Sequence, residues 1–184
     1  PERFKPQRRI EAAELPDAAT KLDMLSRSIA ALTAAGYVYI GMDHFALPGD
    51  ALAVAKRQGR LHRNFQGYST QPDCDLLDQG RLPVVRGLAL SRDDVLRRSV
   101  IMALMCQGQV NFESIGLAHL IDFRRYFATE LDALAPLQAQ GLVTVGPHEI
   151  DVAPTGWFFV RAIAMVFDRY LQADRNRTRF SKII

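Results

Sequence analysis

The feature that most constrains the fold is a single helix followed by a single short strand near the start of the chain. Asp17 is the expected N-cap, and the helical spacing of apolar residues continues until Gly36 ends the helix. Residues 37–40 are β-branched and aromatic and lie between two glycines, which predicts a buried strand. The apolar helix positions are Leu22, Leu25, Ile29 and Leu32. Because one helix and one strand cannot form a parallel sheet alone, we expect the missing neighbours upstream of Pro1.

Two polar segments follow this strand. Asp43 and His44 come directly after it, and polar groups at that place in an α/β fold usually face a ligand. An acidic residue and a histidine there would position an acid or a base over a substrate. The structural alternative is that His44 is a satisfied histidine at a junction between domains.

The second polar segment, residues 61–75, has no apolar periodicity and predicts a long loop. Arg63 offers a guanidinium fork, Asn64 and Gln66 offer amides, and Tyr68 offers a phenol, a set of groups suited to binding carboxylates. The alternative is a polar lid or a hinge between domains.

The rest of the chain predicts several further elements. After the first strand we expect a helix from Ala51 to about Gln58 capped by Asp50, a turn at 78–83 and an edge strand at 84–90. Helices at 91–108, 111–120 and 122–141 should follow. A hairpin of 142–145 with 149–152 and a final helix from Pro154 to Leu171 complete the chain. The predicted buried face of the 91–108 helix carries Val95, Ile101, Leu104 and Met105. Pro136 is expected to kink the last turn of its helix. Helices, a hairpin and a closing helix indicate a winged-helix-like domain.

Two segments carry a resemblance to a known family. Residues 41–46, Gly-Met-Asp-His-Phe-Ala, and residues 62–68, His-Arg-Asn-Phe-Gln-Gly-Tyr, resemble segments of bacterial oxygen-independent coproporphyrinogen III oxidase, a radical S-adenosylmethionine enzyme of haem biosynthesis. The likeness extends over the whole chain but only over the C-terminal part of that enzyme. It implies an oxidoreductase that decarboxylates two propionates of coproporphyrinogen III to vinyl groups, giving protoporphyrinogen IX.

The resemblance also implies an α+β fold in three parts. Residues 1–60 would be the last helix-strand unit of a partial (β/α) barrel, 61–90 a substrate-facing loop and connection, and 91–184 the winged-helix-like domain. Asp43, His44, Arg63, Asn64, Gln66 and Tyr68 are the candidate substrate-binding residues. The four propionates of the substrate would give this polar loop its ligands.

The resemblance further implies a 4Fe-4S cluster and S-adenosylmethionine, whose ligands are not in this chain. Cys74 and Cys106 form no iron-sulfur or zinc motif, and we expect an exposed loop thiol and a core residue respectively. After Leu77 the family continues with a Gly-rich segment and a helix that are absent from this sequence. The segment is either truly deleted or left out of this numbering, and we expect the second. We therefore expect a missing N-terminal radical S-adenosylmethionine barrel as partner, no metal or cofactor bound here, and no activity of the fragment alone.

Composition fits an ordinary soluble protein, with 48% hydrophobic residues, 23% charged residues and a net charge of +3. No apolar run is long enough for a membrane helix and no signal peptide is visible, so we expect a cytoplasmic protein without a membrane partner. The alternatives to the oxidase are a winged-helix DNA-binding module and a haem-binding relative. The pairs at 97–98 and 124–125 are basic, but acidic residues interrupt each face, so we do not expect a nucleic-acid partner.

Overall fold

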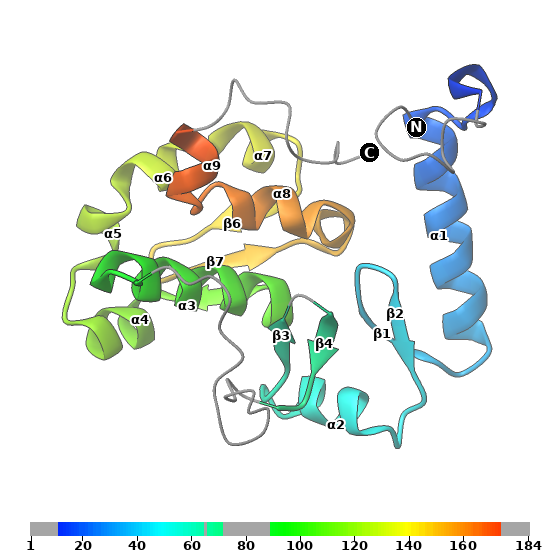
Figure 1. Cartoon of the computed structure of the whole chain (residues 1–184), viewed down its shortest axis with the longest axis horizontal. Coiled ribbons are helices and arrows are strands. Elements are labelled where there is room, and N and C mark those ends of the chain that lie inside the picture. The colour runs from blue at the N-terminus through cyan, green and yellow to red at the C-terminus, as the bar shows by residue number, and fades with distance from the viewer. Residues whose placement is uncertain (1–10, 65, 72–88, 174–184) are drawn as a thin grey trace.

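The computed structural model describes residues 11–64, 66–71 and 89–173, and it combines helices with three small antiparallel sheets (Figure 1). The elements of the first part are η2 (Ala12–Glu14), α1 (Ala18–Ala34), β1 (Val38–Gly41), β2 (His44–Ala46), α2 (Ala51–Arg57), β3 (His62–Asn64) and β4 (Gly67–Ser69). Those of the second part are α3 (Arg92–Gln107), β5 (Gln109–Asn111), α4 (Phe112–His119), α5 (Phe123–Tyr126), α6 (Ala128–Ala133), α7 (Ala135–Ala139), β6 (Val143–Val145), β7 (Glu149–Val152), η3 (Pro154–Phe159), α8 (Val160–Met165) and α9 (Arg169–Ala173).

The first part consists of α1, two hairpins and α2. The β1–β2 and β3–β4 pairs are both antiparallel, so among the described residues β1 has one neighbouring strand, β2. A small core joins these elements to α3, and its buried residues are Ile40, Ala46, Ala53, Ala55, Leu61, Tyr68 and Cys106. Helix α1 lies at the edge of the molecule (Figure 1), and none of its described side chains is buried.

The second part packs helices against a three-stranded sheet of order β5-β7-β6. Its core is larger and aromatic, and its buried residues are Leu96, Val100, Leu104, Met105, Val110, Phe112, Phe123, Phe127, Leu134, Leu142, Val143, Ile150, Val160, Ile163, Ala164 and Phe167. Helix α3 contributes to both cores, because Cys106 lies in the first core and its neighbour Met105 in the second. The two parts therefore pack through α3.

Local signals place most element ends correctly. The side chain of Asp17 caps α1, and Gly36 follows that helix with φ +90°. Ser91 and Asp94 form a capping box at the start of α3, and Gly108 ends α3 in the left-handed conformation. The predicted strand at 37–40, the helix after Asp50, and the 142–152 hairpin are confirmed with shifts of a residue at their ends.

Four predictions are wrong in detail. The segment 61–75 is not a long loop, because 62–64 pairs with 67–69 as a hairpin. The helix predicted over 122–141 is divided into α5, α6 and α7, with Pro136 at the start of α7 rather than as a kink. The final helix is divided into η3, α8 and α9, and β5 was not predicted. On α3, Val95 is 45% exposed and Ile101 only partly buried, while Leu96 and Val100 fill the core beside Leu104 and Met105.

Several expectations fall on residues outside the described ranges. These are Cys74, the turn at 78–83 and most of the edge strand at 84–90. Within the described ranges, no helix has the length and apolar character needed to cross a membrane.

Candidate functional site

The two polar segments of the sequence meet in space. His44 begins β2, Tyr68 is the central residue of β4, and their rings are in edge-to-face contact with centroids 5.2 Å apart. Nδ1 of His44 is 2.8 Å from Oδ1 of Asp43, yet this buried nitrogen makes no hydrogen bond to any described residue. The two side chains are therefore close but lack the geometry of a hydrogen bond.

Two glycines make the close approach of the hairpins possible. A Cβ atom on Gly67 would lie 2.6 Å from Nε2 of His44, and one on Gly41 would lie 2.4 Å from the hydroxyl oxygen of Tyr68. Their φ angles of +141° and +152° also disfavour residues with side chains. Glycine at both positions is thus a requirement of the packing.

Tyr68 is buried, and its hydroxyl donates a 2.9 Å hydrogen bond to the carbonyl oxygen of Met105. Burial raises the pKa of this phenol to about 12. The hydroxyl hydrogen of Tyr68 is therefore engaged by α3, and the substrate-binding role of Tyr68 stays a prediction.

Arg63 also contacts the neighbouring hairpin. Its Nη2 lies 3.2 Å from Sδ of Met42, and its guanidinium carbon lies 5.4 Å from the centroid of the Tyr68 ring. Its Nε is buried without a partner among the described residues. The guanidinium is thus partly enclosed between the hairpins and keeps unused hydrogen-bonding capacity.

Asn64 and Gln66 have different places in the β3–β4 turn. Oδ1 of Asn64 accepts hydrogen bonds from the backbone N–H groups of Gln66, at 2.9 Å, and of Gly67, at 3.3 Å. This use of the asparagine side chain stabilises the turn. The side chain of Gln66 is exposed and remains accessible to a ligand.

Lys56 links the first part of the molecule to the second, a role that the sequence does not indicate. Its ammonium donates to the carbonyl oxygen of Ile40 and lies 4.5 Å from the centroid of the Trp157 ring. Burial lowers the pKa of Lys56. Trp157, the sole tryptophan of the chain, is thereby held beside the end of β1.

A pocket of about 290 Å³ lies where the turn after β1 approaches η3 and the start of α8. Figure 1 shows the β1–β2 turn directed toward the start of α8. Met42 and Asp43 supply the turn side of the pocket, and Arg161 supplies a cation from α8. The remaining lining residues are Leu25, Tyr39, Trp157, Phe158 and Val160. Of the six predicted site residues, Asp43 alone lines this pocket, while His44, Arg63 and Tyr68 pack beside it as the contact between hairpins.

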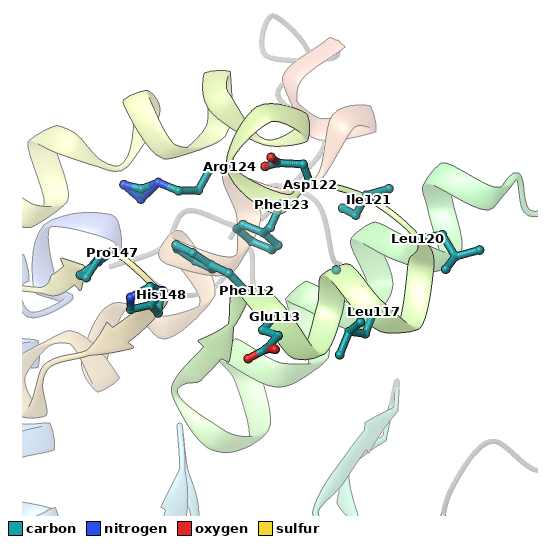
Figure 2. Close-up of a pocket in the computed structure, with 11 residues that line it drawn as sticks. Phe112, Glu113, Leu117, Leu120, Ile121, Asp122, Phe123, Arg124, Pro147 and His148 are labelled. Carbon is teal, nitrogen blue, oxygen red and sulfur yellow. The ribbon is translucent and has the colours of Figure 1, made fainter.

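A second hollow of about 650 Å³ lies against α4 and α5 (Figure 2), and none of the predicted site residues lines it. Phe112 and Phe123 form its floor as a stacked pair with ring centroids 4.4 Å apart. Leu117 and Leu120 stand at its edge and are 71% and 91% exposed. Its lining carries few polar groups that converge on one point, so it does not define a reaction site.

One arginine of each basic pair considered for DNA binding makes contacts within the protein. Arg97 donates to Glu130 at 2.7 Å and to Asp93 at 2.9 Å. Arg124 donates to the carbonyl oxygen of Gly146 at 3.2 Å and lies over the ring of Phe112. These arginines are used to join elements, and the described residues give no separate observation that favours a phosphate-binding face.

Among the described residues, no three His, Cys, Asp or Glu side chains are grouped so that they could hold a metal ion. Cys106 is buried in the first core, as expected. The described part of this chain therefore does not fit an iron-sulfur cluster.

Comparison with known proteins agrees with this architecture. Residues 90–159 match the family model described as the HemN C-terminal domain. The chain is 45% identical to the oxygen-independent coproporphyrinogen III oxidase of Pseudomonas aeruginosa over an alignment of 212 positions that includes all of this chain and 46% of that protein. It is 41% identical to the enzyme of the same name from Salmonella typhimurium, with the same coverage.

A solved structure, described as coproporphyrinogen III oxidase (HemN) from Escherichia coli, a radical SAM enzyme, superposes with a TM-score of 0.82. The sequence identity is 43% over 91% of this chain and 45% of that chain. The chain is therefore similar to the C-terminal part of oxygen-independent coproporphyrinogen III oxidases. It spans about half the length of these relatives.

Proposed function

We propose that this chain forms the C-terminal part of an oxygen-independent coproporphyrinogen III oxidase. The reaction would convert two propionates of coproporphyrinogen III to vinyl groups, each losing carbon dioxide, a hydrogen atom and an electron, and would give protoporphyrinogen IX for haem biosynthesis. The observation that carries the proposal is the 45% identity along the whole chain to a protein of that name. In such enzymes a 4Fe-4S cluster and S-adenosylmethionine supply the radical chemistry.

The apolar face of α1, which is only partly buried, supports a partner that is not among the described residues. Leu22, Leu25, Ile29 and Leu32 recur at helical spacing, but none of them is fully buried. The neighbouring sheet has the two strands β1 and β2. We propose that a radical S-adenosylmethionine barrel covers this face, that residues 1–60 complete the barrel, and that it holds the cluster and S-adenosylmethionine.

The remaining segments would then shape the substrate side of the enzyme. The chain order helix, strand, helices and hairpin across α3, β5, α4 to α7 and β6–β7 supports a winged-helix-like domain over 91–184. With residues 61–90 it would limit the access of water to the reaction. Cytoplasmic location follows from this assignment. The candidates for contact with substrate, directly or through the hairpins, stay Asp43, His44, Arg63, Asn64, Gln66 and Tyr68.

A chimera tests the proposal. The part of the E. coli enzyme that matches this chain is replaced by this chain, once as it stands and once with the E. coli residues that follow the match to Leu77 restored. We expect the restored chimera to produce protoporphyrinogen IX from coproporphyrinogen III under anaerobic conditions, measured by chromatography after oxidation. We expect the chimera without the restored segment, and this chain alone, to be inactive.

An inactive restored chimera that is folded and carries its cluster, as judged by circular dichroism and visible absorption, would contradict the proposed function. Activity of the unrestored chimera would instead show that the segment after Leu77 is dispensable. The alignment of 212 positions against a chain of 184 residues supports a segment that this sequence lacks.

A further inference from the structure

The pocket between the β1–β2 turn and α8 combines an apolar wall with two opposite charges. Trp157 and Phe158 supply aromatic surface, and Asp43 and Arg161 supply a carboxylate and a guanidinium. At about 290 Å³ it is near the lower limit for ligand pockets, enough for one substituted ring but not for a whole tetrapyrrole. The pocket therefore suits one aromatic ring that bears a hydrogen-bond donor and an acidic side chain.

Arg161 differs from several other arginines of the described chain. Arg97 and Arg169 are paired with carboxylates, and Arg63 and Arg124 contact sulfur, carbonyl or aromatic groups. Arg161 is exposed, and its guanidinium forms no ion pair or hydrogen bond with another residue within the described ranges. Its guanidinium is thus free to hold a carboxylate through two parallel hydrogen bonds.

Asp43 supplies the complementary group. Its side chain is 84% exposed, and its Oδ1 lies close to Nδ1 of His44. The unusual backbone beside it, with Met42 at φ +53°, turns the chain at the end of β1 and presents Asp43 at the pocket. An ionised carboxylate accepts hydrogen bonds, so it matches the N–H of a pyrrole.

We propose that this pocket binds one pyrrole ring of the tetrapyrrole substrate, with Arg161 holding a propionate carboxylate, Asp43 accepting the pyrrole N–H and Trp157 covering the ring. This assignment rests on the proposed function and names the part of the substrate that this chain recognises. It places the propionate-binding guanidinium on α8 in addition to the polar loop indicated by the sequence. The other three rings of the substrate would lie outside the pocket.

Binding of coproporphyrinogen III to this 184-residue chain tests the proposal. The ligand retained with the protein after anaerobic ultrafiltration is oxidised and measured by porphyrin fluorescence, and Trp157 emission is followed in parallel. We expect Arg161→Gln to weaken binding about 10-fold or more. Arg161→Lys should weaken binding less, because the ammonium keeps the positive charge and loses only the two parallel hydrogen bonds of the guanidinium. Arg125→Gln, which removes an exposed arginine that does not line the pocket, should leave the affinity unchanged.

Asp43 is tested by a matched pair. Asp43→Asn keeps an oxygen acceptor and Asp43→Leu does not, while both remove the charge, so we expect weaker binding for Asp43→Leu than for Asp43→Asn. The tetramethyl ester of the ligand, which has no carboxylates, should bind equally to the parent chain and to Arg161→Gln.

Equal affinity of the parent chain and folded Arg161→Gln for coproporphyrinogen III would overturn the proposal, and so would absence of binding to the parent chain. The chimera decides the proposed function independently. An active restored chimera together with unaltered binding by Arg161→Gln would reject the pocket and keep the function, whereas an inactive restored chimera rejects the function itself.

Discussion

The imidazole of His44 packs edge-on against the phenol ring of Tyr68, at an interplanar angle of 82°. This contact joins the β1–β2 hairpin to the β3–β4 hairpin, and Tyr68 continues it to α3 through its hydrogen bond to Met105. The two polar segments are therefore one structural unit. Their polar side chains serve packing as well as any contact with a ligand.

Gly67→Ala should separate the two hairpins. The new Cβ would lie 2.6 Å from Nε2 of His44, on a backbone with φ +141°. We expect a loss of about 1–3 kcal/mol in the free energy of unfolding, measured by urea denaturation. Gly49→Ala is the control, because a Cβ there meets nothing within 4 Å, and it should have little effect. Equal stability of the two variants would show that the hairpins do not need this contact.

Tyr68→Phe should destabilise the protein without altering ring packing. The substitution removes the donor to the Met105 carbonyl, and leaving a buried carbonyl unsatisfied costs about 1–3 kcal/mol. Tyr37→Phe, at a position 37% exposed, is the control and should be neutral. A spectroscopic titration adds an independent measurement, since we expect one phenol to ionise only near pH 12. If all the tyrosines ionise near pH 10 in the folded protein, the buried position of Tyr68 is wrong.

Local signals explain why the sequence predicts the element ends so well. Capping residues and C-terminal glycines act within a few positions, so Asp17, Ser91 and Gly108 identify the limits of α1 and α3 without any knowledge of the fold. The hairpin at 62–69 was not predicted, for a different reason. The hairpin at 62–69 has few apolar residues, and it forms because Gly67 and the side chain of Asn64 make its turn.

The candidate site depends on contacts that sequence patterns do not encode. The segment at 62–68 suggests a carboxylate-binding loop, but in the fold Tyr68 is buried and Asn64 is used by the turn. Conversely, Arg161 belongs to an apolar helical segment and gives no signal of its own. It becomes a candidate only because η3 and α8 approach the turn after β1, a long-range arrangement.

Asp93 should make the stability of the folded protein decrease as the pH becomes acidic. Burial raises the pKa of this carboxyl, but hydrogen bonds from Tyr126 and Arg97 and the nearby charge of Arg169 outweigh it, and the net pKa is lowered. A carboxyl whose pKa is lowered in the folded protein contributes stability at pH values above its ordinary pKa. This contribution is lost as the pH falls through the pKa of the folded state. We expect Asp93→Asn to lower the free energy of unfolding by about 1–3 kcal/mol at pH 7, with a smaller difference from the parent near pH 3.

The control for this prediction is Asp132→Asn, because Asp132 is exposed and has no ion pair among the described residues. Denaturation curves at pH 3, 5 and 7 provide the measurement. A constant difference between Asp93→Asn and the parent over this range would contradict the linkage.

Cys106 should be unreactive in the folded protein. Its side chain is buried, and burial raises the pKa of the thiol to about 11 although Arg63 and Lys56 lie nearby. In a Cys74→Ser variant, which leaves this one thiol, we expect reaction with a disulfide reagent at pH 8 to be at least about 100-fold slower in the folded than in the unfolded chain. Comparable rates would show that α3 is accessible at this position.

Lys56→Met should loosen the contact between the two parts of the molecule. Methionine keeps much of the side-chain length but removes the ammonium, so the Ile40 carbonyl loses a donor and the Trp157 ring loses its cation. We expect about 1–2 kcal/mol lower stability and an altered emission of Trp157, the sole tryptophan. Arg57→Met, at the exposed neighbouring position, should change neither property to this extent. Unchanged emission in Lys56→Met would mean that Trp157 does not lie over this ammonium, and the wall of the proposed pyrrole pocket would have to be placed elsewhere.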